Sequence, residues 1–201
     1  MVSDRQDTAR VAVIGDDDEV ARRLADLYAR AGSRVRRVIL GADDPPDGPA
    51  AAIGDGPVDL AILADGFSPP LRRASGVTRE LLHASLRRLT FRPFRLAVRL
   101  RPLLAAAGGG RLVLLSRTSA AMEAPDPDGR YLDRPFRAAA HALWRCLSIE
   151  WRDEGIACIL IVLDEPVTPE AIDRLPATIA AAATGGPGVS PIDGSGLDRP
   201  W

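Results

Sequence analysis

Short, uninterrupted apolar segments alternate along the chain with longer segments in which apolar residues recur at helical spacing. The short segments are residues 11–15, 35–40, 59–64, 112–116, 156–163 and 189–192. Their length and their content of Val, Ile and Leu predict β-strands. Val20, Leu24, Leu27 and Ala31 follow the first strand with the period of an amphipathic helix, which Gly32 ends. This alternation is typical of a parallel sheet covered on both faces, so we expect an α/β fold.

Three further helices are predicted, at residues 77–106, 135–153 and 169–183. The first has leucines on or near one side: Leu82, Leu86, Leu89, Leu96, Leu100 and Leu103. We expect Pro93 to kink this helix or to divide it in two. Residues 41–50 are rich in Pro, Gly and Asp, which argues against regular structure, so residues 41–57 are interpreted as a shortened loop. Residues 1–9 are interpreted as an N-terminal tail.

Composition limits the class of protein. With 201 residues, of which 46% are hydrophobic, the chain has material for one core, so we expect a single domain over residues 1–201. A net charge of −1 provides no general attraction to nucleic acid or to a membrane surface. The sequence has neither a membrane-spanning apolar run nor a signal peptide, which predicts a cytoplasmic protein. It contains neither Lys nor Asn, so no mechanism here uses either side chain.

Five stretches of the chain resemble one enzyme family in order and spacing. They are residues 15–35; residues 89–117, with Phe94, Pro102 and three glycines at 108–110; Ala138, Ala139, Leu147 and Glu150; residues 155–156; and residues 185–197. Together they are similar to the short-chain dehydrogenase/reductase family over nearly the whole chain. The resemblance implies a Rossmann-like, three-layer α/β/α domain with a mostly parallel sheet. Between Gly32 and Asp59 there are too few residues for the usual second helix, third strand and third helix, so we expect the sheet edge after strand 2 to be truncated.

The resemblance places a cofactor-binding turn directly after the first strand. In the family this turn reads Gly-x-x-x-Gly-x-Gly, because glycine lets the backbone approach the pyrophosphate of NAD(P). The three glycine positions of this motif are occupied by Gly15, Glu19 and Ala21, and three carboxylates, Asp16, Asp17 and Asp18, lie between the first two. Each like-charge pair in such a run costs on the order of 1 kcal/mol at roughly 5 Å in a solvent-exposed setting. We therefore expect NAD(P) binding to be badly weakened and no cofactor to be needed.

Two other interpretations of the acidic run remain open. Acidic residues at a helix start cap the free N–H groups and complement the helix dipole. Carboxylate oxygens also bind divalent metals, although the run Asp-Asp-Asp-Glu lacks the spacing of a known metal-binding loop.

The catalytic positions implied by the resemblance have also changed. The Asn position is Leu89, the Ser position is Arg117, and the Tyr-x-x-x-Lys pair is replaced by Asp133 and Arg137. If chemistry persists, the candidate catalytic residues are Ser116, Thr118, Tyr131, Asp133 and Arg137. Tyr131 is interpreted either as a displaced proton donor that pairs with Thr118 or as a surface residue. Asp133 and Arg137 have the spacing of an ion pair within a helix.

Three other features bear on function. His141 lies on the helix face of Arg137 and is either a general base or a partly buried side chain. Nine arginines between Arg72 and Arg101 make the central helix basic, and in the resembled family this helix packs against a partner subunit. On the next helix, a stripe of apolar residues predicts a core or dimer face; it consists of Ala140, Trp144, Leu147 and Trp151.

The two cysteines, Cys146 and Cys158, are expected to act as small hydrophobes.

Two classes of function remain. One is a non-catalytic subunit or scaffold of an assembly of this family, as a homodimer or as a heteromer with a related subunit. The other is a repurposed enzyme of bacterial secondary metabolism, either a divergent reductase or a cofactor-independent cyclase, isomerase or dehydratase. A small-molecule ligand is compatible with both, and neither involves nucleic acid or a membrane.

Overall fold

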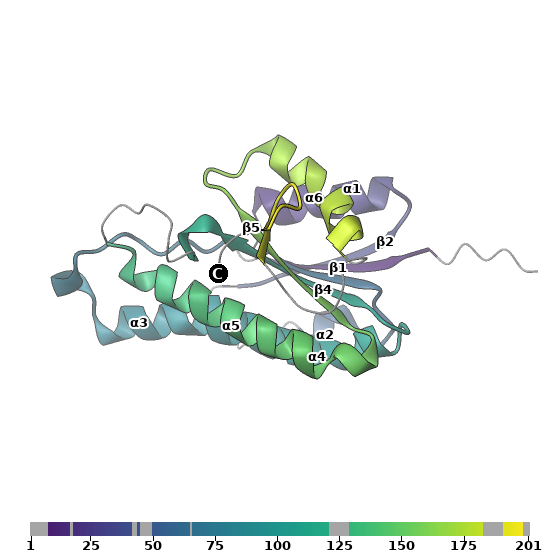
Figure 1. The fold of residues 1–201 in the computed structure, drawn as a ribbon, viewed down its shortest axis with the longest axis horizontal. Coiled ribbons are helices and arrows are strands. Elements are labelled where there is room, and N and C mark those ends of the chain that lie inside the picture. The colour runs from purple at the N-terminus through teal and green to yellow at the C-terminus, as the bar shows by residue number, and fades with distance from the viewer. Residues whose placement is uncertain are drawn as a thin grey trace, which may run out of the picture.

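Six parallel strands form the centre of the molecule (Figure 1). The computed structural model describes residues 8–16, 18–41, 44, 50–64, 66–120, 129–182 and 191–198. The strands are β1 (Arg10–Gly15), β2 (Arg34–Ile39), β3 (Leu60–Ala64), β4 (Arg111–Arg117), β5 (Ala157–Leu163) and β6 (Pro191–Asp193). Their order in the sheet is β2-β1-β3-β4-β5-β6, and every neighbouring pair is parallel. The predicted α/β class with a parallel sheet is confirmed.

Helices cover both faces of this sheet (Figure 1). One layer contains α1 (Glu19–Arg30) and α6 (Pro169–Ala182), which pack against each other. The other contains α3 (Arg79–Ser85), a π-helical segment (Leu86–Phe91), α4 (Arg92–Ala105) and α5 (Arg134–Glu150). The described helices offer no stretch of the length and apolarity needed to cross a bilayer.

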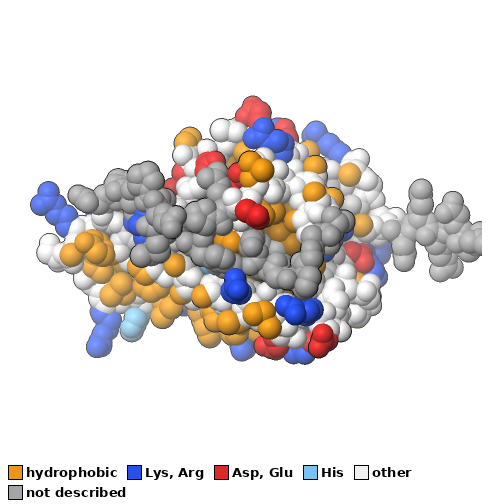
Figure 2. Space-filling view, in the orientation of Figure 1, with side chains coloured by type: hydrophobic (Ala, Val, Ile, Leu, Met, Phe, Trp, Pro, Cys, Tyr) orange, Lys and Arg blue, Asp and Glu red, His pale blue; other side chains and the backbone are white. Residues whose placement is uncertain are grey.

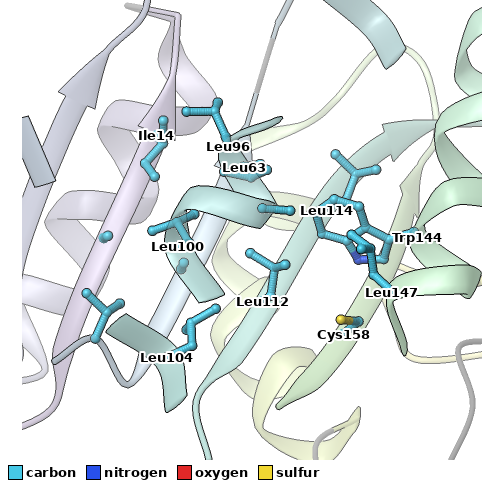
Figure 3. Packing of buried hydrophobic residues seen from close by; sticks show 14 of the residues in the cluster. Ile14, Leu63, Leu96, Leu100, Leu104, Leu112, Leu114, Trp144, Leu147 and Cys158 are labelled. Atoms are coloured by element: carbon cyan, nitrogen blue, oxygen red, sulfur yellow. The ribbon is translucent and has the colours of Figure 1, made fainter. Parts of the chain in front are cut away.

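Each strand contributes to two cores because its side chains alternate between the faces of the sheet. On β4, Leu112 and Leu114 point into the core beneath α4 and α5, whereas Val113 and Leu115 point toward α1 and α6. Figure 3 shows the first of these cores, where Trp144 of α5 packs beside Leu114. The Trp144 indole donates a hydrogen bond to the Ile159 carbonyl at 3.0 Å, so its polar atom is satisfied inside the core.

The sheet edge beyond β2 is truncated as expected, but it contains one element that the loop prediction missed. A four-residue helix, α2 (Ala50–Ile53), lies within residues 41–57. Ile53 is 2% exposed and belongs to the core under α4. Burial of this one side chain stabilises a turn that local composition did not indicate.

The prediction that one leucine face runs along residues 77–106 was wrong at its N-terminal end. Leu89, Leu96 and Leu100 are buried, but Leu82 and Leu86 are 36% and 44% exposed. The π-helical segment begins at Leu86. A π-turn holds more residues than an α-turn, so it rotates α3 relative to α4, and the period of 3.6 residues does not carry across it. Pro93, predicted to kink or divide the helix, lies in the first turn of α4, directly after this segment.

Candidate functional site

The carboxyl ends of β1 and β3 meet where the chain reverses direction across the sheet. From β1 the chain passes outward to β2, then returns to place β3 on the other side of β1. In open α/β sheets, ligands bind at such a switch point. Gly15 ends β1, and a Cβ there would collide with the carbonyl oxygen of Ala64 in β3. Close packing of these two strands therefore requires Gly15, whether or not a cofactor binds.

The acidic run after β1 caps the helix that follows. Asp18 is the N-cap of α1, and its Oδ1 accepts a hydrogen bond from the Ala21 amide at 2.8 Å. Glu19 lies in the first turn. The capping interpretation is thus confirmed for Asp18, whereas Asp17 lies outside the described residues. Among the described residues no group of three acidic, His or Cys side chains has a metal-binding arrangement.

Side chains of the protein fill the crevice at this switch point. Arg88, from the π-helical segment, makes a 2.8 Å salt bridge with Asp16 directly after β1. Its guanidinium carbon also lies 4.0 Å from the centre of the Phe67 ring, in the segment that follows β3. The Arg88 side chain is 12% exposed. Sequence reasoning missed both contacts of Arg88, with Asp16 and with Phe67, because Arg88 is one of nine arginines between Arg72 and Arg101, and only the π-turn and the strand order bring it to the crevice.

Asp133 and Arg137, which occupy the Tyr-x-x-x-Lys positions, form a buried ion pair. Arg137 Nε donates to Asp133 Oδ1 at 2.6 Å, and the two side chains are 6% and 4% exposed. Arg137 also donates to the Phe67 carbonyl at 2.7 Å, which ties α5 to the segment in the crevice. Arg130 lies 3.4 Å from both Asp133 and Glu165. The i, i+4 ion pair expected from the spacing is present.

Ser116 and His141 form a pair that sequence reasoning did not connect. Ser116 Oγ and His141 Nε2 lie 2.7 Å apart, and both residues are buried. Burial, with a smaller contribution from Arg137, lowers the pKa of His141 to about 4. The imidazole is therefore neutral at pH 7 and a weak base. Helical spacing from Arg137 was the only sequence signal, and it could not identify the strand residue that His141 contacts.

The cavity beside these groups is small. Ser116, Arg88 and Arg137 line it together with apolar side chains from β1, β3 and α4. Only about 30 Å³ is open to the centre of a water molecule. By this measure a water needs on the order of 10–15 Å³, so the cavity has room for about two or three waters.

The remaining candidate residues are not gathered around this cavity. Arg117 follows Ser116 on β4 and so points to the other face of the sheet. Burial, and repulsion from the Arg137 charge, lower the pKa of Arg117. Tyr131 is 50% exposed and lines a surface hollow with Leu71 and Arg72. Thr118 begins a short 3-10 turn after β4, and no hydrogen bond joins it to Tyr131 in the part of the chain that the structure describes.

Comparison with known proteins identifies the fold. No family model matches the sequence, and no curated protein does. Solved structures match with TM-scores of 0.82 and 0.79 for two putative short-chain dehydrogenases from Burkholderia multivorans, one of them with bound NADP. They are 16% and 15% identical to this chain, and each match covers 96% of it and 100% of the other chain. The carbonyl reductase Sniffer of D. melanogaster matches with a TM-score of 0.74 at 20% identity, over 94% and 87% of the two chains. The chain therefore has the fold of short-chain dehydrogenases/reductases in a divergent sequence, as the resemblance predicted.

Proposed function

We propose that this protein is a non-catalytic subunit built on the short-chain dehydrogenase fold, which does not bind NAD(P) in the manner of that family. The observation that carries this proposal is the crevice at the switch point. There the salt bridge of Arg88 with Asp16 and the contact of Arg88 with Phe67 lie where a dinucleotide would enter. Side chains of the chain itself therefore occupy the crevice.

Electrostatics oppose a dinucleotide in the same place. Entry of a pyrophosphate would separate Arg88 from Asp16 and leave that carboxylate, together with Glu19, near the phosphate charges. At an effective dielectric constant of about 20, two like charges roughly 5 Å apart repel by about 3 kcal/mol. The N-terminus of α1 does not offset this repulsion, because the Asp18 carboxylate already binds the Ala21 amide there.

Side chains at the former Tyr-x-x-x-Lys positions are engaged with other side chains, and so is Ser116, which lies next to the former Ser position. Asp133 contacts Arg137 and Arg130, and Ser116 contacts His141. The Asp133 carboxylate is 4% exposed and its oxygens are taken up by two guanidiniums, so it belongs to a structural ion-pair cluster. These pairs support a structural role for residues that lie where relatives carry out proton transfer.

A subunit role is supported by the outer surface of the α3–α5 layer. Leu86, Phe91 and Ile149 are 44%, 47% and 56% exposed on it. Figure 2 shows hydrophobic side chains along the lower part of the molecule, over α3, α4 and α5. Trp144 and Trp151, which were candidates for a dimer face, are instead each 1% exposed in the core. Exposed apolar surface of this kind is typical of a protein–protein contact.

Calorimetric titration with NADPH and with NADH tests the proposal. We expect no binding at micromolar cofactor, and a micromolar Kd for either one would overturn the proposal. Two variants test whether the lost glycines alone or the occupied crevice prevents cofactor binding. E19G/A21G restores the glycines alone and should not bind, whereas D16A/E19G/A21G/F67A/R88A also empties the crevice and removes the Asp16 carboxylate, and it should bind more tightly by at least about tenfold. Circular dichroism checks that both variants are folded.

The repurposed enzyme remains the second candidate, and the Ser116–His141 contact at 2.7 Å beside Arg137 is the observation in its favour. If these residues perform chemistry, S116A, D133N and R137A would abolish turnover of any substrate found, while S148A would preserve it. Ser148 lies on the same helix as His141 and bonds only the Arg145 carbonyl.

A further inference from the structure

One edge of the sheet has backbone groups that no described strand pairs with. β2 lies at the end of the strand order, and β1 is its neighbour on the inner side. The Arg34 and Leu40 amides each donate a 2.8 Å hydrogen bond to a carbonyl at either end of β1, so the even-numbered residues of β2 form the ladder with β1. In a parallel ladder the residues between them direct N–H and C=O the other way. Val35 and Ile39 therefore direct these groups to the outer edge.

The two faces of β2 differ in chemistry. Arg36 is in register with Ala12, which belongs to the core under α4, so Arg34 and Arg36 lie on the α4 side of the sheet. Val35 and Ile39 lie on the opposite side, and Ile39 is 50% exposed. A strand added at this edge would meet positive charge on one face and apolar side chains on the other.

A hollow lies on the α4 side of β2, beside the two arginines. About 360 Å³ of it is open to the centres of water molecules, and Arg34, Arg36 and Ile53 line it together with residues 54–58. The Arg36 guanidinium lies against Gly54, where a Cβ would collide with Arg36 Nη1. Gly54 also has a φ of +74°, which favours glycine. The Arg36 side chain is thus directed into the hollow, and the hollow has room for acidic side chains beside it.

Positive charge exceeds negative charge in this hollow. Arg10 also lines it, but its guanidinium is held by Asp59 at 2.8 Å. Neither Arg34 nor Arg36 forms an ion pair within the part of the chain that the structure describes, and Asp55 at the rim contacts neither of them as an ion pair. Two guanidiniums therefore face one exposed carboxylate.

We propose that the outer edge of β2 binds an extended segment of another protein in which acidic and apolar residues alternate. The backbone of this segment continues the sheet through the outward N–H and C=O groups of β2. Its acidic side chains pair with Arg34 and Arg36 over the hollow, and its apolar side chains pack on Val35 and Ile39. In strand addition the main-chain hydrogen bonds supply affinity, and the alternating side chains supply specificity. This inference goes beyond the proposed function, because it involves neither the crevice nor the α3–α5 layer.

A second copy of the chain fits this edge poorly. Depending on the register, antiparallel pairing of two β2 strands places Arg36 opposite itself, Arg34 opposite Arg36, or Arg37 opposite itself. Like charges directly opposite each other destabilise paired strands, and charged edge strands resist self-association. The same arginines attract an acidic strand, so they favour a different partner over a second copy.

Fluorescence anisotropy with a labelled peptide of alternating Glu and Val tests the proposal. We expect saturable binding, at least about tenfold tighter than that of a peptide of alternating Lys and Val. The variant R34E/R36E should reverse this preference. The matched control R30E/R174E makes the same charge change at exposed positions of α1 and α6, and it should leave the Kd of the acidic peptide within about twofold of the wild-type value.

A second variant separates strand addition from charge attraction alone. V35P removes an outward N–H and leaves the ladder with β1 in place, a position where an edge strand tolerates proline. It should weaken binding of the acidic peptide by at least about tenfold, with an unchanged circular dichroism spectrum. Four results would overturn the proposal: no saturable binding at millimolar peptide, equal affinity for the two peptides, equal effects of R34E/R36E and its control, or full binding by a folded V35P. Sedimentation that shows a wild-type dimer abolished by V35P would assign the edge to a second copy instead.

Discussion

The two helical layers of this protein both bury apolar side chains against the sheet, but they differ in the polar groups they bury and the apolar groups they expose. In the α1/α6 layer, the helices bury apolar residues such as Leu24 and Leu175 and present charges outward, including the exposed Arg23–Asp173 pair at 2.6 Å. The α3–α5 layer buries charged and polar groups, among them Arg92, Arg137 and His141, and exposes Leu86 and Ile149. Beside its apolar core, the α3–α5 layer therefore holds buried ions and exposed apolar side chains, neither of which stabilises the monomer by itself, since buried ions are costly and exposed apolar groups gain nothing in the monomer.

The largest expected difference between the layers concerns their ion pairs. R137A leaves the Asp133 carboxylate buried without its closest partner and should lower the free energy of unfolding by about 3–5 kcal/mol. R23A removes one side of an exposed pair and should cost much less, because water and salt screen exposed charges. Chemical denaturation of both variants measures the two values. Equal losses would mean that the buried ion pair stabilises the fold no more than the exposed one does.

The next effect is a dependence on pH that only the α3–α5 layer should show. The His141 pKa falls from 6.5 to about 4 on folding, so the unfolded chain binds a proton between these values and the folded protein does not. Stability should therefore fall as the pH is lowered through this window, by about 3 kcal/mol in total, and the contribution should be absent above pH 6.5. H141Q should flatten the curve of unfolding free energy against pH between 6.5 and 4. An unchanged slope would show that other groups cause the loss.

A smaller effect distinguishes the helix starts of the two layers. Asp18 caps α1 with a 2.8 Å bond to the Ala21 amide, and Thr78 caps α3 with a 3.4 Å bond to the Leu81 amide. D18A should cost about 1 kcal/mol, and T78A should cost less, because its bond is longer and its helix is shorter. Thermal unfolding of the two variants tests this order, which a larger loss in T78A would contradict.

The smallest effect is expected at the exposed apolar residues. L86Q and I149Q should each change the free energy of unfolding by less than about 0.5 kcal/mol, since neither side chain is buried in the monomer. L24A, in the core of the α1/α6 layer, should cost about 2–5 kcal/mol. A large loss in L86Q or I149Q would show that these side chains support the fold rather than face a partner.

Much of the fold was predictable because strands and helices differ in hydrophobic period. The strand positions, the end of α1 at Gly32 and the truncated edge beyond β2 all follow from local pattern and length. At the site, the sequence indicated the lost glycines, the acidic helix cap and the spacing of Asp133 with Arg137. The contacts of Asp16 with Arg88 and of Ser116 with His141 were not predictable, because each joins residues from different elements far apart in the chain.

The sequence by itself determined an α/β domain with the fold of short-chain dehydrogenases. It also has other residues at the positions that this family uses for cofactor binding and proton transfer. Period, glycine placement and residue identity are local properties, and they suffice for those conclusions. Tertiary structure alone decided which contacts the residues near those positions make. The strand order brings Asp16 and Phe67 together, and the π-helical turn directs Arg88 between them while it turns Leu82 and Leu86 outward. These arrangements depend on which elements pack together in three dimensions, and no local pattern carries that information.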